Sequence, residues 1–155
     1  MRQAQHVLTV ATKGKGLVEI TREVAAWVAR QRIETGLLTL FCRHTSASLV
    51  IQENADPDVR TDLQSFFEDI APESRAYVHD TEGPDDMPAH IRTALTGVQL
   101  SIPLARGALM LGTWQGIYLF EHRRAVEPEG RVSGAATTTI ARPHRREVVL
   151  HLLGE

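Results

Sequence analysis

The sequence predicts an α+β fold with largely antiparallel sheet. Strand-like and helix-like segments are mixed up to residue 97, and only strand-like segments follow. This order differs from the regular strand–helix–strand repeat that a parallel sheet needs. A length of 155 residues suits a single domain, residues 1–155, with its own core.

The expected elements follow from apolar spacing and turn residues. Apolar runs predict strands at 7–12, 17–20, 37–43, 47–53, 98–104, 108–113, 115–123 and 147–153. Three helices are expected, capped by Thr21, by Asp56 (ending near residue 70) and by Asp86 (ending at Gly97). Residues 126–143 are rich in Pro, Gly, Ser, Thr and Ala, which predicts a long loop. A small lid or partner-binding loop is the alternative.

Bulk composition excludes several classes of partner. A net charge of −2 and a pI near 6.4 give no electrostatic case for nucleic acid or an anionic membrane.

No segment approaches the ~20 apolar residues of a membrane span, and no signal-peptide pattern is present, so a cytoplasmic protein is expected. The single cysteine, Cys42, alternates with leucines and is expected to be a small buried hydrophobe.

Residues 79–90 concentrate four carboxylates and two imidazoles. Such groups need solvent, a substrate or a cation to satisfy them. Asp86 and His90 are four apart at a helix start, so they share one face. Imidazole with carboxylate suits Zn²⁺, Fe²⁺ or Mn²⁺, whereas carboxylates alone suit Mg²⁺. The alternative is a hydrated loop followed by a capped helix, because the spacing from His79 to His90 matches no compact metal motif.

His44 lies at the end of an apolar strand face and is followed by Thr45 and Ser46. An imidazole beside hydroxyls can hold an oxyanion or phosphate, but it can equally be a half-buried structural histidine. Asn54 ends the next strand. If the two strands pair as a hairpin, as the short connection suggests, His44 and Asn54 lie at its opposite ends.

The second dense segment is 112–123. Two glycines bracket Trp114 and Gln115, which predicts a bulge or tight bend. By alternation Gln115 and Glu121 lie on the apolar side of the following strand. Polar residues at both ends of such a face can line a pocket mouth, and a structural tryptophan with solvent-facing ends is the alternative.

Taken together, these segments resemble the YjbQ family, also called the UPF0047 or secondary thiamine-phosphate synthase family. The resemblance rests on 44–47, 53–54, 79–90 and 112–118, and it extends over about 6–123 and 145–155. It implies a YjbQ-like α+β fold with a β-sandwich and flanking helices, assembled as a homotrimer. An intersubunit cleft of a trimer can join residues that one chain keeps apart. The departure is 126–143, which is longer than the connection expected in the family.

Three functional hypotheses follow. The resemblance implies a thiamine-phosphate synthase-like transferase that couples a pyrimidine pyrophosphate to a thiazole phosphate. Its expected catalytic residues are His44, His90 and Glu121, and its small-molecule substrate is expected to contact Thr45, Ser46, Asn54, Trp114 and Gln115.

The second hypothesis is a trimer that binds a metal or small ligand. Its divalent cation, Mg²⁺ or a transition metal such as Zn²⁺, would be held by His44, His79, Glu82, Asp86 and His90. The third is a structural trimer with a polar interface.

Overall fold

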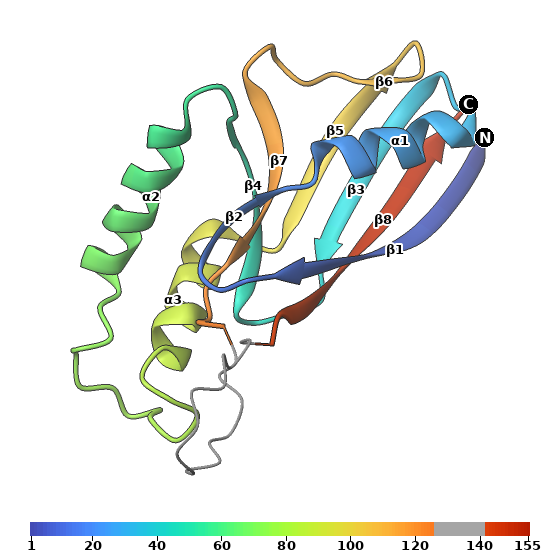
Figure 1. Ribbon diagram of the computed structural model, residues 1–155. Helices are drawn as coiled ribbons and strands as arrows, with labels where there is room; N and C mark the ends of the chain where they lie inside the picture. The colour runs from blue at the N-terminus through green and yellow to red at the C-terminus, as the bar shows by residue number, and fades with distance from the viewer. Residues whose placement is uncertain (126–141) are drawn as a thin grey trace, which may run out of the picture.

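The computed structural model describes residues 1–125 and 142–155 of the chain. Its elements are β1 (Arg2–Thr12), β2 (Gly16–Glu19), α1 (Thr21–Gln31), β3 (Thr35–Cys42), β4 (Ala47–Glu53), α2 (Pro57–Ile70), α3 (Asp86–Thr96), β5 (Gln99–Ala105), β6 (Ala108–Leu109), β7 (Gln115–Glu121) and β8 (His144–Gly154) (Figure 1). All strand pairs are antiparallel. They form a five-stranded sheet, β1-β8-β3-β5-β6, and a three-stranded sheet, β2-β7-β4. The predicted α+β class with antiparallel sheet is therefore confirmed.

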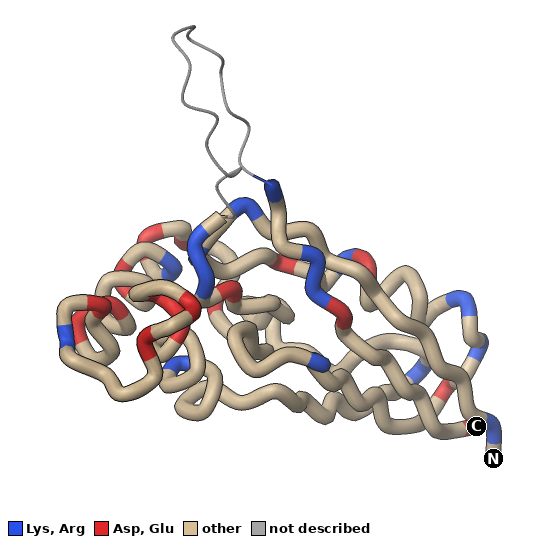
Figure 2. The backbone as a smooth tube through the Cα atoms, turned by 90° about the horizontal axis from the view of Figure 1, so that it is seen from below, with Lys and Arg blue, Asp and Glu red and all other residues tan. Residues whose placement is uncertain are grey.

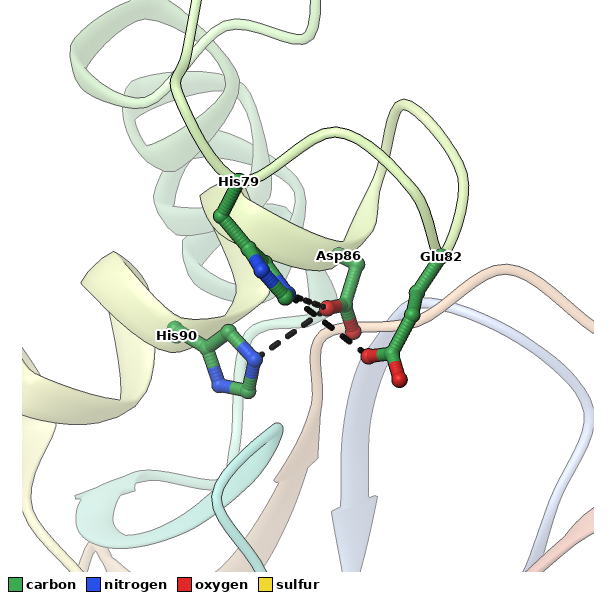
Figure 3. Close-up of side chains that lie close together, drawn as sticks. All are labelled: His79, Glu82, Asp86 and His90. Carbon is green, nitrogen blue, oxygen red and sulfur yellow. Dashed lines mark hydrogen bonds and ion pairs between the residues drawn. The ribbon is translucent and has the colours of Figure 1, made fainter.

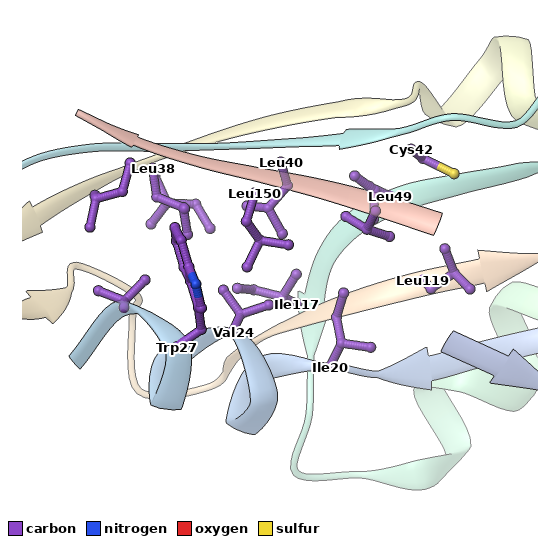
Figure 4. Close-up of a cluster of buried hydrophobic side chains, with 14 of the residues drawn as sticks. Ile20, Val24, Trp27, Leu38, Leu40, Cys42, Leu49, Ile117, Leu119 and Leu150 are labelled. Carbon is purple, nitrogen blue, oxygen red and sulfur yellow. The ribbon is translucent and has the colours of Figure 1, made fainter. Parts of the chain in front are cut away.

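One apolar core lies between the two sheets. Alternate side chains of β3, including Leu38 and Cys42, point inward and are at most 1% exposed. They meet Leu49 of β4 and Leu119 of β7 from the second sheet, while α1 closes the remaining side with Trp27 (Figure 4). Period-two alternation places every second residue of a strand on the buried face. The prediction that Cys42 is a buried hydrophobe is confirmed.

The predicted hairpin of the third and fourth strands is wrong. β3 already pairs on both edges, with β5 and β8, whereas β4 pairs with β7 in the other sheet. Residues 43–46 therefore cross between sheets. Backbone hydrogen bonds fix this crossing at both sides: Arg43 N–H donates to the Glu147 carbonyl, and His122 N–H donates to the Ser46 carbonyl.

Two of the three predicted helix caps are wrong. Asp56 caps α2 as expected, since its Oδ1 accepts from Asp58 N–H at 2.9 Å. Thr21 is instead the first residue of α1, and its hydroxyl links Glu19 to the Ile117 N–H of β7. Asp86 is likewise the first residue of α3, and Asp85 occupies the N-cap position.

The helices α2 and α3 lie together at one end of the molecule, beside β4 and β2 (Figure 1). The 71–85 connection between them belongs to the same end. Figure 2 shows acidic and basic positions intermixed there. Most of the predicted 126–143 loop lies outside the described residues. β8 begins at His144, three residues before the predicted strand, because its pairing with β1 extends to Thr12.

The outer face of the five-stranded sheet carries exposed apolar side chains. Val7, Leu37, Phe41 and Leu153 are 39–45% exposed, and their strands are neighbours in the sheet. Across residues 1–125 and 142–155, no helix combines the length and apolar character needed to cross a membrane.

Candidate functional site

Four side chains of the acidic segment converge at the start of α3. We call His79, Glu82, Asp86 and His90 the His–carboxylate group. Each offers one ligand atom, and these atoms all lie within 4.8 Å of one another (Figure 3). Asp86 and His90 come from the first turns of α3, one above the other, as predicted. His79 and Glu82 reach them from the preceding loop.

Asp86 is the centre of the group. Its Oδ2 accepts a hydrogen bond from His79 Nε2 at 2.8 Å and lies 3.2 Å from His90 Nε2. Glu82 approaches from the other side, with Oε2 3.6 Å from His79 Nε2. Only 2% of Asp86 is exposed, whereas the side chains of His79 and Glu82 are 44% and 65% exposed. The group thus has a buried carboxylate at its base and a solvent-facing rim.

A hydrogen bond at Nδ1, the ring nitrogen that does not face Asp86, fixes the orientation of His90. Its Nδ1 lies 2.9 Å from the carbonyl oxygen of Thr45. A carbonyl only accepts hydrogen bonds, so Nδ1 must carry the proton. In the neutral ring, Nε2 then presents a lone pair to Asp86 Oδ2, which is itself an acceptor. A proton or a cation is needed to make this 3.2 Å approach favourable.

Arg123, just beyond β7, fixes the acidic side of the group. Its guanidinium donates to Asp86 Oδ1, to Asp85 Oδ2 at 2.9 Å and to the Glu82 carbonyl at 2.9 Å. Asp85 also accepts from the backbone N–H of Arg124. Both carboxylates are therefore engaged outside α3, and Asp85, the N-cap residue, makes no side-chain capping hydrogen bond. The contacts leave Asp86 Oδ2 directed at the two histidines.

Burial and hydrogen bonding act in opposite directions on both aspartates. Burial disfavours the charged form of Asp86, but the hydrogen bond from His79 and the charge of Arg123 outweigh it and lower its pKa. For Asp85, burial is outweighed by the Arg124 N–H and by Arg123, which again lowers the pKa. Both carboxylates are thus anionic at neutral pH, and this anionic form is the one that binds cations.

His44, the remaining predicted metal ligand, lies outside the group. Its Nε2 accepts from the Glu147 N–H at 2.8 Å, so its free proton is on Nδ1. Burial, with the charge of Arg146, lowers its pKa and keeps the ring neutral. His44 and Thr45 instead line an open pocket whose wall also includes His90. Ser46 is 9% exposed and is not part of that wall.

The predicted substrate residues Asn54, Trp114 and Gln115 lie at the far end of the three-stranded sheet. The β4–β7 register pairs Glu53 with Gln115 at this end and Ala47 with Glu121 at the other. Asn54 N–H donates to the Trp114 carbonyl at 3.0 Å. Gln115 N–H donates to the Gly112 carbonyl, which confirms the predicted bend. One chain therefore keeps these residues apart from the His–carboxylate group.

Glu121, predicted to be catalytic, is 0% exposed and forms an internal ion pair. It accepts from Arg146 Nε at 2.7 Å and Nη2 at 2.5 Å, and also from Thr12 and the Arg123 N–H. Burial disfavours its ionisation, but the hydrogen bonds from Arg146 outweigh this effect and lower its pKa. Its hydrogen bonds link β7 to β1 and β8 in the protein interior, and the carboxylate has no exposed surface that a substrate could contact.

Two polar contacts are not indicated by the sequence. Arg123 is separated from Asp86 by 37 residues, which hides their contact. The second contact is made by His122. It is 1% exposed, and its Nε2 lies 2.8 Å from Ser48 Oγ. The only available signal was an uninterrupted Glu-His-Arg-Arg run at the end of an apolar strand.

Comparison with known proteins identifies the family. A family model described as "UPF0047 protein YjbQ-like" matches residues 6–155. A UPF0047 protein of Synechocystis is 51% identical over 99% of this chain and 94% of its own length. The UPF0047 protein YjbQ of Salmonella typhimurium is 48% identical over 77% of this chain and 87% of its own.

Solved structures agree with this result. A conserved hypothetical protein from Thermus thermophilus is 35% identical, with a TM-score of 0.74 over 96% of this chain and 99% of that one. A YbjQ-like protein of unknown function from Sulfolobus solfataricus shares the fold, with a TM-score of 0.80 at 23% identity over 99% of each chain. The resemblance found in the sequence is confirmed, and the chain belongs to the YjbQ-like UPF0047 family.

Proposed function

We propose that this protein binds a divalent transition metal in the His–carboxylate group and uses it in catalysis on a small molecule. The observation that carries the proposal is the contact between His90 Nε2 and Asp86 Oδ2. Thr45 holds the His90 proton on the opposite nitrogen, so two acceptors face each other at 3.2 Å. A cation between them, like a second proton on the ring, resolves this conflict. The cation is the proposal made here, because a metal ligand held by a hydrogen bond on its other nitrogen is the usual arrangement in metal sites.

The donor set favours particular metals. Two imidazoles with two carboxylates suit Zn²⁺, Mn²⁺ or Fe²⁺ better than Mg²⁺, which prefers oxygen ligands. Arg123 and Thr45 fix Asp86 and His90 in advance, so little ordering is needed on binding. A metal held here would supply a Lewis acid or an activated water. The solvent-facing rim formed by His79 and Glu82 supports access of a substrate.

The reaction proposed first is the one that the family resemblance implies, coupling of a pyrimidine pyrophosphate to a thiazole phosphate. Positively charged side chains that could bind the phosphate groups are scarce here, because Arg123 is paired with carboxylates. A cation in the group would offset this scarcity. Asn54, Trp114 and Gln115 would act on this substrate from a second copy, within the homotrimer that the resemblance implies. The exposed apolar face of the five-stranded sheet supports such an interface. The buried, unpaired Cys42 fits a cytoplasmic setting for this activity.

Zinc and manganese uptake tests the metal proposal. Calorimetric titration with elemental analysis is expected to show about one equivalent bound by the wild type. Asp86→Asn is expected to weaken binding by about 10- to 100-fold or more. Asp80→Asn is the matched control, because Asp80 is an exposed carboxylate of the same loop outside the group. Absence of stoichiometric uptake, or equal losses in the two variants, would remove the metal centre.

The synthase reaction is tested separately with metal-loaded protein. Formation of thiamine phosphate is expected from the wild type and the Asp80→Asn control, and not from Asp86→Asn. If metal is bound but the wild type makes no more product than Asp86→Asn, the synthase assignment falls and the metal centre stands.

A further inference from the structure

An open pocket of about 620 Å³ lies beside the His–carboxylate group. Its walls come from the end of β3, from the 43–45 connection between the sheets, and from α3 (Figure 1). They are lined by Phe41, Cys42, Arg43, His44, Thr45, His90, Thr93, Ala94 and Val98. This volume falls within the range of about 300–1,000 Å³ that is typical of small-molecule sites.

The pocket and the His–carboxylate group share one side chain. His90 lines the pocket, and its Nε2 lies 3.2 Å from Asp86 Oδ2. Thr45, which accepts the His90 Nδ1 proton, lines the pocket as well. A molecule in the pocket therefore lies against the imidazole that the metal would use, and one end of it can reach the group.

The pocket wall is mainly apolar, with a few placed polar groups. Phe41, Ala94 and Val98 offer carbon surface, whereas the Cys42 side chain is 1% exposed and points into the core. His44 offers a donor, because its Nε2 accepts from the Glu147 N–H and its Nδ1 keeps the proton. This combination suits a flat apolar body that carries a hydrogen-bond acceptor.

One charged side chain also lines the pocket. Arg43 adds a guanidinium to the wall, but its Nη1 lies 3.3 Å from Glu147 Oε2, so a ligand shares this charge with a carboxylate.

We infer that the pocket binds the flat apolar body of a small organic acid whose acidic end reaches the His–carboxylate group. The inference rests on the proposed metal centre and adds the shape and charge of its substrate. The body lies against Phe41, Ala94 and Val98, with an acceptor toward His44. The acidic end is the part that a bound cation would attract.

Two hydroxamates of different size test this directly, because both carry the same metal-binding acid and differ only in the body. Benzohydroxamate is expected to bind the zinc-loaded wild type at least about tenfold tighter than acetohydroxamate, because its ring is buried in the pocket. Ala94→Phe fills the pocket and is expected to abolish this preference. Leu95→Phe is the matched control: Leu95 is the next residue of α3, is exposed and does not line the pocket.

The outcomes separate the two proposals. Zinc is measured by elemental analysis in every sample, and protein mass by light scattering. If zinc is bound but both hydroxamates bind equally to the wild type, the pocket assignment is overturned alone. If Ala94→Phe binds both probes like the wild type but its mass falls, a second copy occupies the pocket, and the assignment is again overturned. If no zinc is bound, the proposed function fails, while a preference for benzohydroxamate that Ala94→Phe removes still supports the pocket.

Discussion

Replacing Arg146 by methionine should strongly destabilise the fold, because it leaves Glu121 charged and alone in the core. Glu121 is 0% exposed, and the Arg146 side chain is 8% exposed. Removing one partner of a buried ion pair costs about 3–5 kcal/mol. Thr12 and the Arg123 N–H still donate to Glu121, which favours the lower half of that range. At about 2–4 °C per kcal/mol for a chain of this length, the melting temperature should fall by roughly 10 °C.

Thermal and urea unfolding of matched variants measure this loss. Arg145→Met is the control, because Arg145 is the neighbouring residue of β8 and is exposed on the other face. It should change stability by less than about 0.5 kcal/mol. Adding Glu121→Gln to Arg146→Met should recover part of the loss, since the amide carries no charge. Equal melting temperatures for Arg146→Met and Arg145→Met would refute the buried-pair account.

The pH dependence of the same variants gives a second check. Glu121 has a pKa below its ordinary 4.5, so its contribution to stability is complete above that pH. This contribution to stability is lost as the pH falls through the lower pKa that Glu121 has in the folded protein. Without Arg146, only the hydrogen bonds from Thr12 and the Arg123 N–H oppose the effect of burial, so the pKa of Glu121 is higher than in the wild type. The stability gap between wild type and Arg146→Met should therefore narrow below about pH 5. A gap that widens on acidification would contradict this sign.

Three further predictions concern the group, the core and the sheet face. Arg123→Lys should weaken zinc binding by about 10- to 100-fold in calorimetry, because an ammonium cannot hold both aspartates and the Glu82 carbonyl at once; unchanged affinity would contradict this role. Burial, with the charge of Arg92, lowers the pKa of His122 to about 3, so stability should fall by roughly 1.4 kcal/mol per pH unit as the pH drops from about 6.5 toward 4.5. His122→Leu should flatten that slope in urea unfolding, and an unaltered slope would exclude His122 as its source. For the proposed homotrimer, the wild type should have the mass of three chains in light scattering, and Leu37→Arg on the exposed sheet face should reduce it to that of one chain. An unchanged mass in the variant would contradict an interface on this face.

Much of the fold follows from local patterns in the sequence. Apolar alternation located the core strands, and the proline after Asp56 located α2. The pairing of the strands could not be inferred from these local patterns. A four-residue connection after β3 is compatible with a hairpin or with a crossing between sheets, and only the competition of β5 and β8 for the edges of β3 decides between them.

The candidate site was predictable where its residues are close in sequence. The i, i+4 spacing of Asp86 and His90 required their contact if α3 formed. The role of Arg123 was hidden, because it depends on how the end of β7 approaches the start of α3. The separation of Asn54 and Trp114 from the histidines was also hidden, since it follows from the β4–β7 register rather than from any local pattern.

Anomalous diffraction from a zinc-soaked crystal tests the central claim most directly. One strong zinc peak is expected within about 2.0–2.2 Å of His79 Nε2, His90 Nε2 and an Asp86 oxygen, with the His90 Nδ1 contact to Thr45 preserved. A fully soaked crystal without density between these atoms, or with zinc bound only at other histidines, would contradict it.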